Sequence, residues 1–306
     1  MSNLTKTEKL SDLVKNVRGE VVDILDEFRK TIPNTLYHYT SLNGLDGILK
    51  NREFWVTRYN FLNDVTELYY TYDLCKEIIF EMSQSQKKYE QVLKFLNTHL
   101  FEMDENIYIL SLTTNMDSNL LWSNYSKNDG YNIALAYPDM VNDFKRGDEE
   151  KEYLIYCANV IYDKEKQKKM LKRIVNNVFE IMEKNWVNEE ITEDLEDFSS
   201  TLSMAIRLLA CFFKDEAFSQ EEEVRVIFYR NPLFSTEKNF RISNGSFIPY
   251  ITVPFSEEGR LIKGVTIGPK NKIDIAEKGM ELFLRTHGYD YIENNSVIKS
   301  RIPYRY

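Results

Sequence analysis

Residues 221–228 read Glu-Glu-Glu-Val-Arg-Val-Ile-Phe, and this run of charged and β-branched residues predicts a strand. The alternation of a strand places Glu221, Glu223 and Arg225 on one face and the two valines on the other. Two carboxylates and a guanidinium then share one surface. This surface is either a solvated or salt-bridged strand edge, or a carboxylate site that stabilises an oxocarbenium-like centre in glycosyl transfer.

Outward from this run, strand and helix signals are mixed along the chain without strict alternation. This order predicts an α+β fold rather than a doubly wound parallel sheet. Helical periodicity covers residues 8–32, 64–102, 164–212 and 273–287, and the strand signals lie at residues 36–39, 53–57, 107–112, 132–137, 154–162, 223–229, 249–253 and 265–267 and near residue 297.

Few residues suit a linker, because the 306 residues include only 11 glycines and 7 prolines, and the sequence contains no repeat. We therefore expect a single domain over residues 1–306. An amphipathic helix at residues 1–33 opens this domain. Residues 34–306 form its core, with helical insertions near residues 64–102 and 164–212.

The charge balance is acidic, with 39 Lys and Arg against 48 Asp and Glu and a formal net charge of −9. This balance disfavours non-specific binding to duplex nucleic acid. A basic run at residues 164–173 keeps a local nucleic-acid contact open, although a solvated helix start explains it too. The amino terminus lacks an apolar signal core and no stretch of about 18 apolar residues occurs, so we expect neither secretion by that route nor a membrane span.

The three cysteines are odd in number and far apart in the sequence. This pattern argues against a disulfide framework and favours a reducing cytoplasm. No Cys/His pair has the spacing of zinc ligands, and no glycine-rich phosphate loop follows a strand. We therefore expect a cytoplasmic protein that holds no metal and has neither a P-loop nor a Rossmann fold.

Three shorter clusters contain residues whose side chains can bind a ligand. His38 lies in a short strand that leads into a turn, and its imidazole either donates to a ligand ribose or phosphate or forms a core hydrogen bond to a backbone carbonyl. Asp64 and Glu67 match a helix N-cap and its capping-box partner, which is a sufficient structural role. Trp122 and Tyr125 share a face if their segment is helical; burial explains them, although a flat ring also stacks on a nicotinamide or a base.

Taken together, these clusters resemble the bacterial domain-of-unknown-function family 2971. The resemblance extends over about residues 36–305 with the motifs in order, and Phe218 stands where a tryptophan is expected. The motifs that carry the resemblance are Tyr37-His38-Tyr39-Thr40-Ser41, Gly47-Ile48-Leu49, Phe54-Trp55-Val56-Thr57, Leu62-Asn63-Asp64 with Glu67, Trp122 and Tyr125 before Gly130, Phe218 with Glu221, Glu223 and Arg225, Ile267-Gly268-Pro269, and Ile302-Pro303-Tyr304-Arg305.

That family in turn is similar to a distant ADP-ribosyltransferase fold, a split mixed or antiparallel β-sheet core that grips NAD+. By this resemblance, His38 holds the adenosine ribose, and Glu223 bonds the nicotinamide ribose and stabilises its oxocarbenium, with Glu221 as a second catalytic candidate. Arg225 either grips a pyrophosphate or orients Glu223. The other residues that the resemblance places at the NAD+ site are Tyr39, Thr40, which supports the strand of His38, Trp55 or Tyr59, whose ring packs on nicotinamide, Thr57, Asn63, Asp64, Trp122 and Tyr125.

The resemblance implies an NAD+-dependent ADP-ribosyltransferase that modifies a macromolecule, with NAD+ as substrate and without a metal. Small bacterial transferases of this fold often act as intracellular toxins in phage defence or toxin–antitoxin modules, so we expect a protein, DNA or RNA acceptor and an antitoxin or other regulator as partner. The alternatives are an NAD+ glycohydrolase, which passes the ribosyl centre to water, and a non-catalytic nucleotide- or partner-binding module. The N-terminal helix either docks on the core or pairs two copies of the chain, and no membrane partner is expected.

Overall fold

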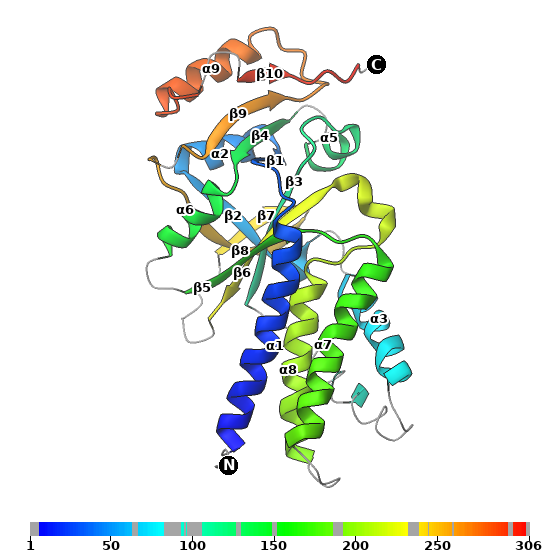
Figure 1. The fold of residues 1–306 in the computed structure, drawn as a ribbon. Helices are drawn as coiled ribbons and strands as arrows, with labels where there is room; N and C mark the ends of the chain where they lie inside the picture. Colours follow the sequence, from blue (N-terminus) through cyan, green and yellow to red (C-terminus); the bar gives the residue numbers. More distant parts are fainter. Residues whose placement is uncertain are drawn as a thin grey trace. The chain divides into compact units, whose positions relative to one another are not determined.

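The structure is a computed structural model of the 306-residue chain (Figure 1). The chain divides into two compact units, which we call the helical unit and the sheet unit. The N-terminal helix and both predicted helical insertions lie in the helical unit, and the strands of the described residues lie in the sheet unit. The helical unit comprises residues 1–30, 63–105 and 160–219, the sheet unit comprises residues 31–62, 106–159 and 220–306, and the structure describes residues 6–62, 67–82, 93–94, 96, 106–126, 130–148, 152–185, 192–231, 239–243, 245–258, 260–292 and 296–303.

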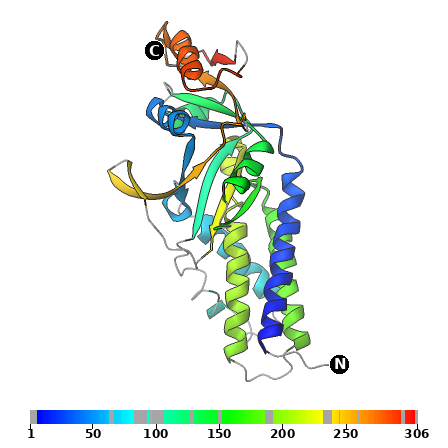
Figure 2. The ribbon, with the colours of Figure 1, turned by 90° about the vertical axis from the view of Figure 1, so that its left-hand side faces the viewer.

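The helical unit is built from α1 (Lys6–Arg29), α3 (Glu67–Met82), α7 (Lys164–Asn185) and α8 (Thr192–Ala210). Both α1 and α3 pack against α7 and α8, and Figure 2 shows α1, α7 and α8 running side by side. The apolar stripe predicted for the N-terminal helix is buried, because Leu13, Val17, Val21, Ile24 and Leu25 are each at most 3% exposed. The later part of the predicted helix at residues 64–102 lies mostly outside the described residues.

The basic run at the start of α7 faces acidic residues of neighbouring helices. Lys168 Nζ lies 2.7 Å from a carboxylate oxygen of Glu77 in α3. Arg173 lies 2.7 Å from Glu20 and 3.0 Å from Glu27, both in α1. Lys168 and Arg173 are thus paired within the helical unit, and this pairing favours a charged helix face over a nucleic-acid surface.

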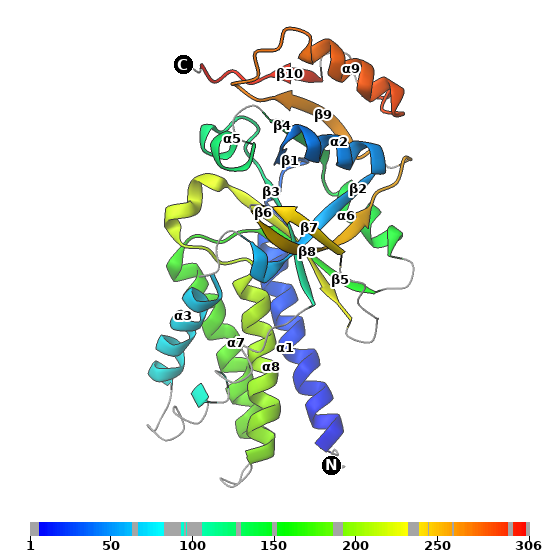
Figure 3. The ribbon, with the colours of Figure 1, turned by 180° about the vertical axis from the view of Figure 1, so that it is seen from behind.

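The sheet unit contains a mixed sheet with ten strands among the described residues, which confirms the predicted α+β class. The strand order is β10-β9-β4-β1-β3-β2-β8-β7, with β6 paired to β3 and β5 paired to β6. Only β9 and β10 pair in parallel among the described strands, and Figure 3 shows them with β4 and β1 at one end of the sheet. The strands are β1 (Thr35–Thr40), β2 (Glu53–Arg58), β3 (Ile107–Thr113), β4 (Tyr131–Ala136), β5 (Tyr153–Asn159), β6 (Glu223–Arg230), β7 (Asn239–Ser243), β8 (Ser246–Pro254), β9 (Ile262–Ile267) and β10 (Val297–Lys299).

The branch point of this sheet is β3. One edge of β3 pairs with β6 along its whole length, whereas β1 and β2 share the other edge. β1 pairs near the end of β3, at Tyr37 and Thr113, and β2 pairs near its start, with Thr57 opposite Ile109. The two partners therefore diverge along β3 and leave a split between them. A split sheet is thus observed, while its ADP-ribosyltransferase type stays a prediction.

The turn after β1 leads into a helix that approaches the strand closely. Ser41 Oγ caps this helix by accepting the Gly44 N–H over 3.1 Å. A Cβ on Gly44 would lie 2.1 Å from Thr40 Oγ1, so the close approach requires glycine. Thr40 thus packs where strand and helix meet, which suits its predicted supporting role. The helices of the sheet unit are α2 (Leu42–Asn51), α5 (Asn119–Ser126), α6 (Asp139–Gly147) and α9 (Ala276–Thr286), with the short 3-10 helix η1 (Tyr59–Phe61).

Two elements of the sheet unit escaped the sequence analysis. In α6, Met140, Val141 and Phe144 are buried at helical spacing over only nine residues. The strand β7 is only five residues long, and its apolar side chains are exposed. The dipeptide Asn244-Gly245 is a hairpin signal that would have revealed β7, because Gly245 has a φ of 76° in the turn to β8. None of the described helices combines the length and the apolar character that a membrane span needs.

Candidate functional site

One face of the sheet collects side chains from six strands. Register places Thr113 of β3 opposite Glu223 of β6, and Thr57 of β2 opposite Ile109 of β3. Residues that pair across antiparallel strands project to the same side, so these side chains share one face, which we call the Glu223 face. By register and alternation, the Glu223 face carries Tyr37, Tyr39, Trp55, Thr57, Ser111, Thr113, Glu223, Arg225, Arg241 and Tyr250.

Glu223 and Arg225 form a buried ion pair on this face. Arg225 Nε donates to Glu223 Oε1 over 2.8 Å, and the side chains are only 2% (Arg225) and 8% (Glu223) exposed. Their predicted common face is confirmed. Of the alternative interpretation, a solvated or salt-bridged strand edge, the salt bridge is observed. The solvated edge is wrong, because β6 lies between β3 and β5. Of the two roles predicted for Arg225, the contact favours orienting the carboxylate of Glu223 over gripping a pyrophosphate.

Glu221 lies outside the strand, contrary to the predicted alternation. It ends the 3-10 helix η2 (Glu216–Glu221), and β6 begins only at Glu223. Between them Glu222 has a φ of 45°, a left-handed conformation that turns the chain. The carboxylate of Glu221 is nevertheless buried, and its Oε1 accepts the hydroxyl of Tyr125 over 2.9 Å. The structure therefore brings Glu221 and Tyr125 together, although by a turn rather than by strand alternation.

His38 lies in the split, beside the part of β3 that pairs with neither β1 nor β2. Its Nδ1 lies 3.2 Å from the carbonyl oxygen of Ser111; because a carbonyl only accepts, Nδ1 carries the proton. Burial lowers the pKa of His38, and the charge of Arg241 lowers it further, against the opposing effect of the Ser111 hydrogen bond. One of the two predicted interpretations, a hydrogen bond to a backbone carbonyl, is therefore observed. Alternation in β1 places His38 and Glu223 on opposite sides of the sheet, so the structure does not bring them onto one face.

An aromatic pair with one exposed ring lies on the Glu223 face. The rings of Trp55 in β2 and Tyr250 in β8 stack with centroids 4.6 Å apart and an interplanar angle of 21°. Trp55 is 43% exposed, whereas Tyr59 is half-buried in η1. Of the two rings predicted to pack on nicotinamide, Trp55 is therefore the one presented on the same face as Glu223.

Tyr39 and Trp122 are core residues. Trp122 is fully buried, its Nε1 donates to Asp117 Oδ1 over 2.7 Å, and its ring meets that of Tyr39 edge-on at 4.7 Å. The Tyr39 hydroxyl donates to the Asn115 carbonyl and accepts the Ser118 N–H, each over 3.0 Å, and burial raises its pKa to about 12. Neither ring offers a face to a nicotinamide or a base, so burial is the account that fits both.

Arg241 is a cation on the Glu223 face that sequence analysis missed. It lies in β7, and its Nη2 donates to the buried hydroxyl of Thr57 over 2.8 Å. The family resemblance places Thr57 at the NAD+ site, and in the structure its hydroxyl accepts a hydrogen bond from this guanidinium. Two further predicted residues, Asn63 and Asp64, lie outside the described residues. Within the described part of the chain, no group of three or more Cys, His, Asp and Glu side chains is arranged to hold a metal ion.

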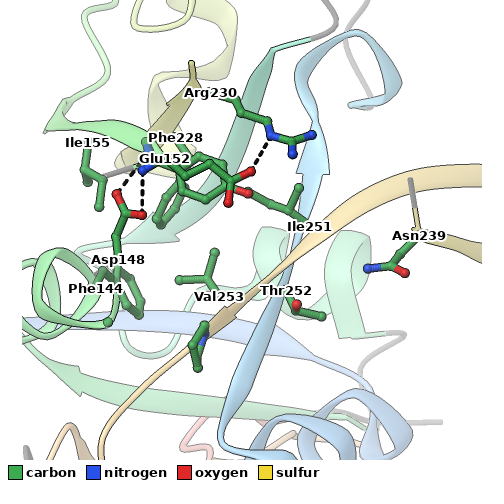
Figure 4. A pocket seen from close by; sticks show the side chains of 13 residues that line it. Phe144, Asp148, Glu152, Ile155, Phe228, Arg230, Asn239, Ile251, Thr252 and Val253 are labelled. Atoms are coloured by element: carbon green, nitrogen blue, oxygen red, sulfur yellow. Dashed lines mark hydrogen bonds and ion pairs between the residues drawn. The ribbon is translucent and has the colours of Figure 1, made fainter. Parts of the chain in front are cut away.

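A cavity of about 630 Å³ lies elsewhere in the sheet unit, lined by α6, β5, β6, β8 and the start of β7 (Figure 4). Its wall includes the rings of Phe144 and Phe228, and Arg230 in it pairs with Glu152. Asp148 accepts the N–H of Glu152 over 2.8 Å. The volume suits a small molecule. None of the sequence-predicted site residues lines this cavity.

Comparison with known proteins gives one match. Residues 121–226 match the family model described as "Protein of unknown function (DUF2971)". No curated protein and no solved structure matches the chain. The matched segment contains Trp122, Tyr125 and the start of β6 with Glu223 and Arg225, whereas the motifs quoted before and after it lie outside the match. Over residues 121–226 the chain is thus similar to the domain-of-unknown-function family 2971, the family that its motifs resemble.

Proposed function

We propose that this protein is an NAD+-dependent ADP-ribosyltransferase that modifies a macromolecule. The observation that carries the proposal is the position of Glu223, a buried carboxylate held by Arg225, on the same sheet face as the exposed Trp55, which stacks on Tyr250. A carboxylate and an exposed stacking surface on one face are the parts that a ribosyl transfer from a nicotinamide nucleotide requires.

The buried, ion-paired position of Glu223 suits the chemistry of the proposed transfer. In the proposed transfer, the bond between ribose C1 and the nicotinamide nitrogen breaks, and nicotinamide leaves with the bonding electrons. Positive charge then develops on the ribose, and a fixed anion in a water-poor site stabilises it more strongly than water does. The acceptor forms the new bond to C1 and loses its proton to a base or to water. Arg225 holds the carboxylate of Glu223 in one orientation, so little reorganisation is needed during the reaction.

Glu221 is the second carboxylate of the proposed site. It lies two residues before Glu223, and Tyr125, which is 39% exposed, donates to it. This hydrogen bond fixes the carboxylate at the end of η2. We assign Glu221 a positioning role towards the acceptor or the ribose, with Tyr125 as the residue that holds it.

A non-catalytic binding module is the second candidate, and one observation favours it. Each carboxylate already has a partner, since Arg225 bonds Glu223 and Tyr125 bonds Glu221. A carboxylate neutralised by a guanidinium is often a structural element. In this alternative, the Trp55–Tyr250 pair recognises a ring of the ligand and no bond is broken.

The deciding experiment incubates the full chain with adenine-labelled NAD+ and cell lysate. Wild type is compared with Glu223→Gln and with Glu277→Gln, which makes the same chemical change at an exposed position of α9. Circular dichroism confirms that each variant is folded. Portions of each reaction are then treated with protease, DNase or RNase.

Label entering a macromolecule with wild type and Glu277→Gln, but not with Glu223→Gln, supports the transferase, and the digestion that releases the label identifies the acceptor class. Label appearing only as free ADP-ribose replaces the proposal with an NAD+ glycohydrolase. Intact NAD+ with every protein overturns the proposal in favour of the binding module.

A further inference from the structure

Arg241 is a cation of the Glu223 face whose donors are only partly satisfied by the described residues. It lies in β7, and among the described residues no carboxylate lies within ion-pair distance of it. Its Nη2 donates to Thr57 Oγ1 over 2.8 Å. Its Nε is buried and has no hydrogen-bond partner within the described part of the chain. Buried guanidinium donors are ordinarily paired, so this one indicates a site for a bound anion.

The groups around Arg241 are neutral or directed elsewhere. Tyr250 lies on the neighbouring strand, and the pKa of its hydroxyl is raised chiefly by burial. The imidazole of His38 is held neutral by burial. Glu53 projects on this face too, and its Oε1 accepts the Trp55 indole N–H over 2.9 Å. None of these groups supplies the negative charge that Arg241 lacks.

The aromatic pair next to Arg241 restricts the kind of anion. Tyr250 and Arg241 lie on the same β7–β8 hairpin, gold in Figure 2, and Trp55 stacks on Tyr250. Arg241 and Trp55 both project on the Glu223 face. A ligand that uses all three residues has a flat ring and a charged oxygen-rich group attached to it. Nucleotides have this combination, and a guanidinium matches a phosphate with parallel donors.

We propose that Arg241 binds the phosphate groups of a nucleotide whose ring stacks on the Trp55–Tyr250 pair. The inference rests on the proposed function in naming NAD+ as that nucleotide, and it assigns the pyrophosphate to Arg241. Arg225, the cation named by the sequence, is already bonded to Glu223 and is 2% exposed, so it is not available for this role. Arg241 and the aromatic pair therefore set the specificity for a phosphorylated substrate, while Glu223 faces the ribose.

The test measures binding of ADP-ribose and of nicotinamide riboside by calorimetry, because the first contains the pyrophosphate and the second contains no phosphate. Wild type is compared with Arg241→Gln and Arg241→Lys, and Arg146→Gln in α6 removes the same charge from an exposed position. We expect Arg241→Gln to weaken ADP-ribose binding about tenfold to hundredfold, as for the loss of a charged hydrogen bond. Arg241→Lys should lose less, and nicotinamide riboside should bind all four proteins equally.

Inorganic pyrophosphate serves as a second probe that is independent of NAD+. Equal affinity of wild type and Arg241→Gln for ADP-ribose overturns the inference while leaving the proposed function intact. Pyrophosphate binding that depends on Arg241, without any binding of NAD+ or ADP-ribose, supports the phosphate site and overturns the proposed function. If wild type binds neither pyrophosphate nor NAD+ nor ADP-ribose, both the inference and the proposed function are overturned.

Discussion

Arg225 Nε donates to Glu223 Oε1 over 2.8 Å, and the two side chains are 2% and 8% exposed. Both residues also project from the same side of β6, which lies in the interior of the sheet. A buried ion pair of this kind keeps a fixed geometry. Removing only one of its two partners strongly destabilises the fold, because the other charge stays buried without a partner. The same pair therefore links the stability of the sheet unit to the proposed chemistry.

Replacing one partner of this pair should destabilise the protein strongly. Arg225→Met leaves the carboxylate of Glu223 buried without its guanidinium, and we expect the free energy of unfolding to fall by about 3–5 kcal/mol. The double variant Glu223→Gln/Arg225→Met removes both charges and should lose less than the sum of the two single variants. Urea unfolding of the four proteins measures the coupling, and strictly additive losses would show that the contact is energetically unimportant.

His38 should make the stability depend on pH. Burial lowers its pKa below the ordinary value of 6.5, so the unfolded chain binds the proton more readily than the folded one. This contribution to stability is fully present above pH 6.5 and is lost as the pH falls through the folded pKa. His38→Asn keeps a donor for the Ser111 carbonyl but does not titrate.

Urea unfolding between pH 7.5 and 5.5 tests this prediction. The free energy of unfolding should decrease more steeply with acid in wild type than in His38→Asn. His287→Asn, which changes the imidazole of α9 that also bonds a backbone carbonyl, is the matched control and should follow wild type. Identical slopes for wild type and His38→Asn would contradict the predicted shift.

Asp117 should anchor the end of the chain to α5. Its Oδ1 accepts Trp122 Nε1 over 2.7 Å and Ser300 Oγ over 2.6 Å, and its Oδ2 accepts the Arg301 N–H over 2.8 Å. Asp117→Ala removes all three hydrogen bonds, and we expect a loss of at least about 2 kcal/mol in the free energy of unfolding. Hydrogen exchange at Arg301 should accelerate in Asp117→Ala and less in Asp117→Asn, and unchanged exchange would refute the anchoring role.

The cysteines should resist thiol reagents in the native protein. Cys75, Cys157 and Cys211 are free and buried, and burial raises the pKa of Cys75 to about 12. The reactive form is the thiolate, which is scarce at neutral pH under these conditions. A thiol titration with a chromogenic disulfide should be slow in buffer and reach three equivalents in denaturant. A fast native reaction would show that one of the three thiols is accessible.

The strand and helix predictions succeeded where the pattern is long or strongly apolar. Neighbouring strands pair with both edges of the run Val224–Phe228, so the run is buried. Its β-branched residues are typical of such a strand and predicted it correctly. The prediction failed at Glu221, because strand alternation assumes extended backbone and Glu222 has a positive φ. It also failed at β7, whose exposed Phe240 and Ile242 give no burial signal and whose turn signal, the Asn-Gly dipeptide, was overlooked.

Local chemistry along the chain therefore determined the α+β class, the amphipathic α1 and the common face of Glu223 and Arg225, since each depends on residues a few positions apart. The partners of those residues were decided only by tertiary structure. Trp55 meets Tyr250 and Thr57 meets Arg241 because β2 pairs with the hairpin almost two hundred residues later, and no local pattern encodes such a pairing. Trp122 became a core residue for the same reason, because its hydrogen-bond partner Asp117 is also bonded to Ser300 at the far end of the chain.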